Sequence, residues 1–180
     1  MNDEINTKVE SAVRGAKVTS VYRDNDGAFH AIVRLPIYGG AQSLASAVLP
    51  EHSQVEDFPK PKFTNIDSGS MDKNYTGLII DCRGLNISTA ISPSIKSESG
   101  EEIYTYKKIS YQTAINKGMV DCSNDINSNE QRASSNPLIV KAISISGECD
   151  AVISQADSDK VLLANQTSKF LNNCMVVFVR

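Results

Sequence analysis

The residues best placed for chemistry in this 180-residue chain stand at the end of an apolar run. Residues 76–80 are followed by Asp81 and Arg83, an acid and a base separated by one residue, and then by Gly84. Sheets that combine strands and helices often carry functional groups at the carboxyl ends of buried strands. Asp81 and Arg83 therefore either form a small-molecule-binding or hydrolytic site or hold the turn as an ion pair. The ion pair is favoured, because no histidine or nucleophilic serine accompanies them in a known catalytic spacing.

Aromatic side chains supply a second candidate site. Tyr104 and Tyr106 share one face of an expected strand, and Tyr111 follows them. Exposed aromatic residues on a sheet can mark an interaction surface, and packing in the core explains the same pattern equally well. The two histidines are expected on the surface, His30 on the polar side of a strand and His52 in a polar stretch.

No cofactor or metal site is expected. The carboxylates of Asp157 and Asp159 stand at the start of a predicted helix, where the helix dipole already explains them. The cysteines are widely spaced and lack the paired C-x-x-C spacing of a structural zinc site. Free thiols are the preferred interpretation, with one disulfide as the alternative. The four cysteines are Cys82, Cys122, Cys149 and Cys174.

Charge and hydropathy exclude two classes of partner. The 18 Lys and Arg residues against 21 Asp and Glu residues give a net charge of -3, without the basic block that would neutralise a row of phosphates. No nucleic acid is therefore expected. No apolar run approaches the roughly 18 to 20 residues of a spanning helix, so membrane contact is expected only through a lipid anchor, which this chain lacks. The first residues also lack the pattern of a signal peptide, which predicts a cytoplasmic protein unless an export signal was removed.

The first part of the chain predicts a helix and a hairpin. Apolar residues spaced by four predict a short helix over residues 4–13. Two extended stretches, 17–22 and 28–35, are separated by an Asp-Gly step, which is a strong signal for an antiparallel hairpin. Residues 42–49 predict a helical turn or a further extended piece. The polar, proline-containing stretch that follows predicts an exposed linker, because it has too little apolar surface to offset the entropy of ordering.

The second part predicts a mixed sheet. The expected strands are 76–81, a hairpin of 91–95 with 103–109, an antiparallel pair of 137–146 with 150–154, and 175–179. Residues 111–115 could form a helical turn, and 122–136 a surface loop or weak helix around 126–133. Ser154 and Asp157 predict the start of a helix that runs to about Asn165. The last strand is expected beside 76–81 or 151–154 in the centre of one sheet, reached by a right-handed parallel crossover.

The predicted fold class is thus α+β. An N-terminal helix plus antiparallel hairpin precedes a mixed-sheet α/β domain that closes with a strand-helix-strand crossover. The expected organisation is a partial helix-plus-hairpin subdomain over residues 1–49, a linker over 50–74 and the mixed-sheet domain over 75–180.

The predicted hairpin resembles part of a known family. Residues 21–36, VYRDNDGAFHAIVRLP, are similar to the closing hairpin of the bacterial LPP-twenty surface lipoproteins. A distantly similar domain opens a flagellar ring-assembly protein. Residues 75–85, 136–142 and 153–180 resemble the region that follows this domain in some exported bacterial proteins. The lipid-attachment cysteine of the family and the front of its domain are absent from this chain.

This resemblance implies a bacterial cell-envelope protein, periplasmic or associated with the outer membrane, that is not an enzyme. It implies a structural or protein-protein interaction role, in a surface lipoprotein or in envelope assembly, with other envelope proteins or further copies of the chain as partners. It transfers no catalytic residue. Asp81, Arg83, Tyr104 and Tyr106 remain the candidates for ligand binding or interaction.

Overall fold

The computed structural model describes residues 2–63, 74–126 and 132–180. The chain divides into two compact units, which are described separately below. Unit 1 comprises Met1–Glu51 with Ile115–Lys117, and unit 2 comprises His52–Ala114 with Gly118–Arg180. Residues 64–73 of the expected linker and residues 127–131 of the expected polar loop lie outside the described residues.

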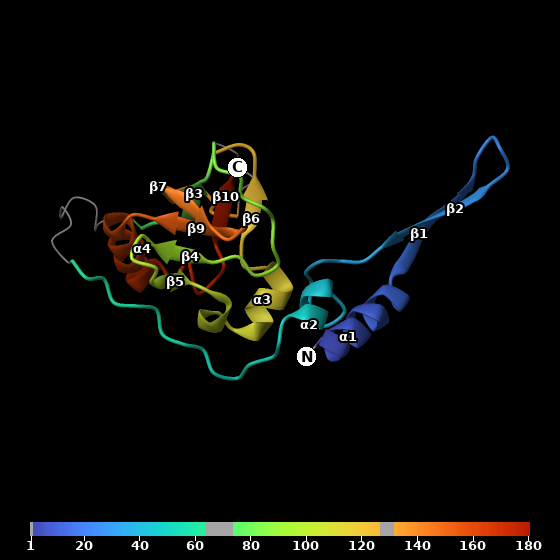
Figure 1. Cartoon of the computed structure of the whole chain (residues 1–180), viewed down its shortest axis with the longest axis horizontal. Helices are drawn as coiled ribbons and strands as arrows, with labels where there is room; N and C mark the ends of the chain where they lie inside the picture. Colours follow the sequence, from blue (N-terminus) through green and yellow to red (C-terminus); the bar gives the residue numbers. More distant parts are fainter. Residues whose placement is uncertain (1, 64–73, 127–131) are drawn as a thin grey trace. The chain divides into compact units, whose positions relative to one another are not determined.

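Unit 1 contains two helices and a two-stranded sheet (Figure 1). Its elements are α1 (Asn2–Arg14), β1 (Lys17–Arg23), β2 (Phe29–Arg34) and α2 (Leu44–Val48). The expected antiparallel hairpin is confirmed. Its turn is held by Asp24, whose carboxylate accepts the backbone N–H groups of Asp26 and Ala28 at 3.0 and 2.8 Å. Gly27 completes the turn with φ +87°, a conformation that favours glycine.

Unit 2 is built on two four-stranded sheets. The first sheet has the order β6-β10-β3-β7, and every pairing in it is parallel. Its strands are β3 (Gly77–Asp81), β6 (Asp121–Ser123), β7 (Pro137–Lys141) and β10 (Val176–Val179). The second sheet has the order β5-β4-β9-β8 and mixes parallel with antiparallel pairs. Its strands are β4 (Ile95–Ser97), β5 (Glu102–Tyr104), β8 (Ser144–Ser146) and β9 (Asp150–Ile153).

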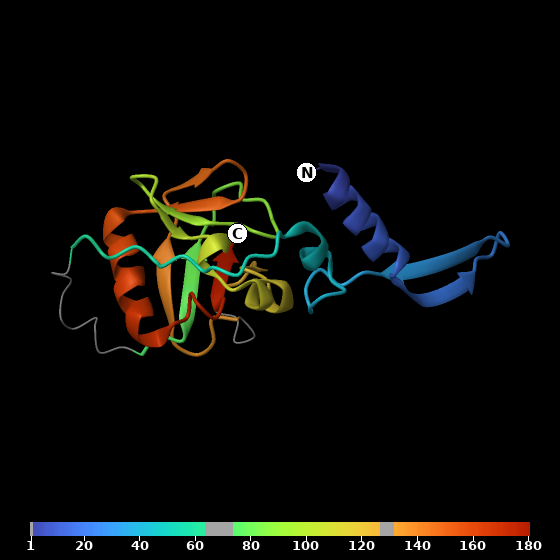
Figure 2. The ribbon, with the colours of Figure 1, turned by 90° about the horizontal axis from the view of Figure 1, so that it is seen from below.

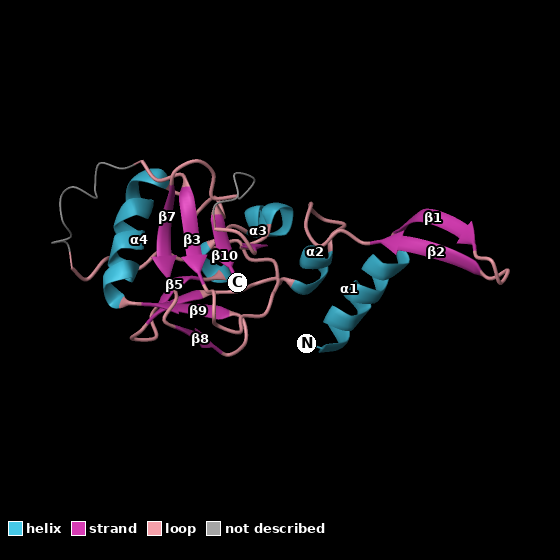
Figure 3. Cartoon of the chain, turned by 90° about the horizontal axis from the view of Figure 1, so that it is seen from above, coloured by secondary structure: helices cyan, strands magenta, loops and turns pink. Residues whose placement is uncertain are grey.

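A long helix, α4, lies beside these sheets. Among the described residues, the helical elements that follow β5 are η2 (Tyr106–Lys108, a 3-10 turn), α3 (Tyr111–Lys117), whose last three residues belong to unit 1, and α4 (Gln155–Ser168). Figures 1 and 3 show α4 beside the sheets. The two central strands of the parallel sheet, β3 and β10, carry the core, because nearly all of their residues are buried. The mixed α and β architecture agrees with the predicted fold class.

Several predicted elements are confirmed. The final strand, β10, pairs with β3 in the centre of a sheet. The strands β8 and β9 pair antiparallel. The helix α4 begins after Ser154, whose hydroxyl oxygen accepts the backbone N–H of Asp157 at 3.1 Å. All four cysteines are free thiols, with Cys82 and Cys174 buried.

The predicted crossover within one sheet is wrong. The strand-helix-strand order is present, but α4 connects β9 of the mixed sheet to β10 of the parallel sheet. The single strand expected over 137–146 is likewise two strands. The Ala142 N–H donates to Asp81 O at 2.9 Å in the parallel sheet, whereas the Ile143 N–H donates to Val152 O at 2.8 Å in the mixed sheet. The chain therefore changes sheets between these two residues.

Three further predictions need correction. The strand expected over 103–109 ends at Tyr104, because residues 106–108 form the 3-10 turn η2. The strand expected over 91–95, its hairpin partner, is observed as β4, which starts at Ile95 rather than at residue 91. A short strand, β6, occupies Asp121–Ser123, where only loop was expected at 122 and 123. Strands of three residues leave too short a pattern in the sequence to be recognised.

Candidate functional site

Asp81 and Arg83 bind each other at the carboxyl end of β3. Arg83 Nε donates to Asp81 Oδ1 at 2.8 Å, and Arg83 Nη2 donates to Asp81 Oδ2 at 2.7 Å. The backbone N–H of Arg83 also donates to Asp81 Oδ1 at 3.1 Å. This bidentate contact lowers the pKa of Asp81 below its ordinary value. Both carboxylate oxygens are thus engaged within the turn.

The residues beside this pair add no reactive group. Cys82 is fully buried, and burial raises the pKa of its thiol to about 12, so the thiol is neutral and a poor nucleophile. Lys141 is paired with Asp81 in the strand register and lowers the pKa of the Asp81 carboxyl a little further. Arg83 itself is more than half exposed. The contact between Asp81 and Arg83 therefore holds an exposed turn together.

The two candidate tyrosines have separate environments. Tyr104 is fully buried, and its hydroxyl donates to Met119 O at 2.7 Å, so this side chain packs in the core and is not available at the surface. Tyr106 lies in η2 and is half-buried. Its ring makes an edge contact with His52, with ring centroids 4.8 Å apart. The break in the strand after Tyr104 is what separates the two aromatic residues.

The hairpin of unit 1 is exposed along its whole length. Every residue of β1 and β2 is exposed, including Phe29 at 77% and Val21 at 63%. Residues that pair across an antiparallel ladder share a face, and alternate residues share a face along a strand. The register therefore gathers five apolar residues on the same side as Arg23. They are here called the apolar face: Val18, Val21, Phe29, Ala31 and Val33.

The opposite face of the hairpin is mixed: it carries Ile32 together with Tyr22, His30 and polar residues. The ring of Tyr22 stacks on that of His30 with centroids 5.0 Å apart, and His30 Nε2 lies 2.6 Å from Asp24 Oδ2. The bond from His30 lowers the pKa of Asp24. On the apolar face, the guanidinium of Arg23 lies 5.3 Å from the centroid of the Phe29 ring. The hairpin thus has one mixed face, on which Tyr22, His30 and Asp24 contact one another, and one exposed apolar face.

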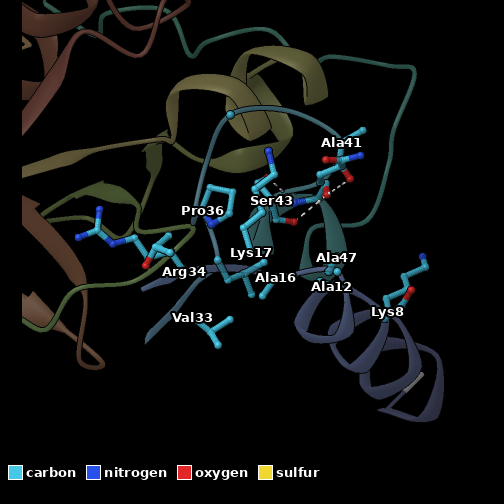
Figure 4. Close-up of a pocket in the computed structure, with 17 residues that line it drawn as sticks. Lys8, Ala12, Ala16, Lys17, Val33, Arg34, Pro36, Ala41, Ser43 and Ala47 are labelled. Atoms are coloured by element: carbon cyan, nitrogen blue, oxygen red, sulfur yellow. Dashed lines mark hydrogen bonds between the residues drawn. The ribbon is translucent and has the colours of Figure 1, made fainter. Parts of the chain in front are cut away.

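A hollow of about 1060 Å³ lies at the base of the hairpin, between α1, α2 and the ends of β1 and β2 (Figure 4). Lys8, Lys17 and Arg34 line it together with small residues, and no acid is among its lining residues. Lys17 and Arg34 are directly opposite each other in the strand register. The three cations are exposed, so the hollow is a surface feature rather than an enclosed ligand cavity.

Sequence reasoning found the hairpin but not its exposure. The alternation of Phe29, Ala31 and Val33 with polar residues predicts a strand with one apolar face. The same alternation is expected whether a helix, a sheet or only solvent covers that face. The signal was therefore present in the sequence, and only the structure shows that every residue of β1 and β2 is exposed.

The comparison with known protein families gives a match over most of unit 2. Residues 77–180 match the model of a protein family described as Treponema pallidum Tp0624, second domain. The matched segment contains both four-stranded sheets and the helices α3 and α4. Among curated proteins, no match was found. The match does not reach the hairpin, so the similarity of residues 21–36 to the LPP-twenty lipoproteins stays a prediction.

Proposed function

This chain belongs to the family of the second domain of Treponema pallidum Tp0624, and on that premise we propose that it is a non-enzymatic protein of the bacterial cell envelope. Its role is structural or one of protein-protein interaction, in envelope assembly or as a surface lipoprotein. The contact surface is the apolar face of the hairpin, and its occupant is another envelope protein.

The observation that carries this proposal is the exposure of the apolar face. Phe29 and Val21 are 77% and 63% exposed, and they lie in a two-stranded sheet in which every strand residue is exposed. Contiguous apolar surface of this kind marks interaction sites in folded proteins. An aromatic side chain next to an arginine, as in Phe29 and Arg23, has the composition that interfaces favour.

The alternative is a small-molecule-binding or hydrolytic domain that uses Asp81 and Arg83. These two side chains satisfy each other through a bidentate contact on an exposed turn. A catalytic acid or base needs a free position toward its substrate. The paired geometry of Asp81 and Arg83 therefore supports a role in holding the turn rather than a catalytic role. No candidate metal cluster of histidine, cysteine or acidic residues occurs in the described part of the chain. No helix in that part is long and apolar enough to cross a membrane.

Photo-crosslinking in the source bacterium tests the proposal. A photoreactive residue is placed at Phe29, and a matched control is placed at Ile139, an exposed residue of β7 in unit 2. We expect crosslinks from position 29 to a distinct envelope protein, which then binds the purified chain, and none from position 139. Recovery of the full gene product in the cytosolic fraction would overturn the envelope assignment. Equal crosslinking from both positions would overturn the hairpin as the contact surface.

A further inference from the structure

We infer that two copies of this chain pair through the free edge of β2, antiparallel, to form one four-stranded sheet with the order β1-β2-β2-β1. The inference rests on the proposed role of the hairpin as a contact surface and assigns the occupant of its edge: a second copy of the same chain. The apolar face remains free for the envelope partner, because edge pairing uses backbone groups rather than that face.

The backbone groups that would make this contact are known from the hairpin itself. The Asp24 N–H donates to Ala28 O at 3.0 Å, which makes this pair a hydrogen-bonded one. Hydrogen-bonded and non-hydrogen-bonded pairs alternate along an antiparallel ladder. The pairs Val21–Ala31 and Arg23–Phe29 are therefore of the second kind, and their backbone N–H and C=O groups point outward. At the β2 edge the outward groups belong to Phe29, Ala31 and Val33.

The edge of β2 is better suited to pairing than the edge of β1. The ladder is irregular between Val18 and Ser20, so β1 carries a bulge at Thr19, whose hydroxyl donates to Ile32 O at 3.2 Å. Bulges, prolines and inward charges are the devices that protect edge strands from pairing. β2 has none of these within Phe29–Arg34. Its edge is thus the regular and unprotected one.

The sequence of β2 is complementary to itself in one register. With the two-fold axis at Ala31, Phe29 lies opposite Val33 of the second copy, and His30 lies opposite Ile32. The small Ala31 side chains meet at the centre, and Arg34 lies opposite Ala28, so no two charges face each other. A shift by two residues would place His30 opposite Arg34, an unfavourable pairing when the histidine is protonated.

Pairing of two copies would also supply the additional strands that an isolated hairpin lacks. An isolated two-stranded hairpin is marginally stable in water, and three or more strands with an apolar face are needed for independent stability. All residues of both strands are exposed. Joining two hairpins gives four strands whose apolar face is continuous across the axis, with Phe29 of each copy beside Val33 of the other.

A charge-swap experiment at Ala31 tests the inference by analytical ultracentrifugation of the full chain. Ala31 is exposed and faces itself across the axis, so A31K and A31E each place two like charges opposite each other. We expect the wild type to be dimeric and each variant alone to dimerise at least about tenfold more weakly. An equimolar mixture of A31K and A31E should form heterodimers, because the opposite charges then meet.

The matched control is V21K, which adds a charge to the same face on the other strand, opposite Ala31. It should dimerise like the wild type. A monomeric wild type, a dimer unaffected by A31K and A31E, or equal loss of dimer in V21K would each overturn the inference. None of these results bears on crosslinking from Phe29 to a different protein, so failure of the dimer and failure of the proposed function are distinguishable. The mixture also shows that the variants fold, since unfolded chains would not pair.

Discussion

The carboxylate of Asp159, in α4, accepts the backbone N–H of Lys62 at 2.8 Å, across 97 positions of sequence. The N–H of Phe63 donates to the other oxygen of the same carboxylate at 3.2 Å. Asp159 is only 1% exposed. These bonds attach the end of the segment 52–63 to α4, and Figure 2 shows this segment running to that helix. A stretch with the composition of a linker is thus attached over part of its length.

Replacing Asp159 with alanine should release the end of this segment. Two backbone donors would lose a charged acceptor, which predicts a loss of about 2 to 3 kcal/mol in the free energy of unfolding. The amides of Lys62 and Phe63 should exchange with deuterium faster, as measured by NMR. K160A, at the next residue of the same helix, is the control and should leave both amides protected. Unchanged exchange in D159A would show that the carboxylate does not hold the segment.

Gly77 should tolerate no side chain. A Cβ at this position would lie 2.5 Å from Ala133 Cα and 2.7 Å from Met175 O, and both are backbone atoms that cannot rotate away. G77A is therefore expected to lower the free energy of unfolding by about 1 to 3 kcal/mol, measured by urea denaturation.

Gly15 provides the comparison for this substitution. The nearest atoms to a Cβ there lie at 3.6 Å, an ordinary contact distance. G15A should change stability by no more than about 0.5 kcal/mol. Equal effects of the two substitutions would contradict the close approach of Gly77 to the backbone around Ala133.

The ion pair between Lys96 and Asp150 should make stability depend on pH. Lys96 Nζ lies 2.8 Å from Asp150 Oδ2, and the Ser94 N–H donates to Asp150 Oδ1 at 2.9 Å. Burial raises the pKa of Asp150, but the bonds from Lys96 and Ser94 outweigh it, so the pKa lies below 3.8. D150N should cost about 1 to 3 kcal/mol at neutral pH, measured by denaturation.

The direction of the pH effect follows from the lowered pKa of Asp150. A carboxyl whose pKa is lower in the folded chain stabilises the fold above its unfolded pKa of 3.8 and loses this contribution as the pH falls through the folded value. The difference between the wild type and D150N should therefore shrink below about pH 4. A difference between the wild type and D150N that grows in acid would contradict the assignment.

Arg83 should control the pKa of Asp81 without contributing much stability. R83A removes the bidentate contact, so the pKa of Asp81 should rise toward its ordinary value, as followed by NMR of the carboxyl carbon. Because Arg83 is exposed, the free energy of unfolding should change by no more than about 1 kcal/mol. K141A should raise the pKa of Asp81 less than R83A does. A pKa of Asp81 that is unchanged in R83A would show that Arg83 does not stabilise the Asp81 carboxylate.

Elements specified by local signals were predictable from the sequence. The Asp26-Gly27 step predicts the hairpin, because glycine adopts positive φ without steric cost. Ser154 and Asp157 predict the start of α4, because a hydroxyl three residues before a free N–H can cap it. The short distance along the chain between β8 and β9 predicts their antiparallel pairing. The acid and base at positions 81 and 83 are adjacent enough that an ion pair between them could also be anticipated.

The sequence alone does not show which side chains become buried and which elements bury them. The apolar run that leads through Ala142 to Ile143 looks continuous, and only the hydrogen bonds to two different sheets divide it. Tyr104 and Tyr106 stand in one pattern, yet one is in the core and the other contacts His52.

The reason is that backbone signals act over a few residues, whereas burial depends on segments far apart in the chain. The sequence by itself therefore determined the hairpin, the capped helix and the central apolar strands of this protein. Only the tertiary structure decided that Asp159 holds Lys62, that α4 joins two sheets and that Phe29 remains exposed.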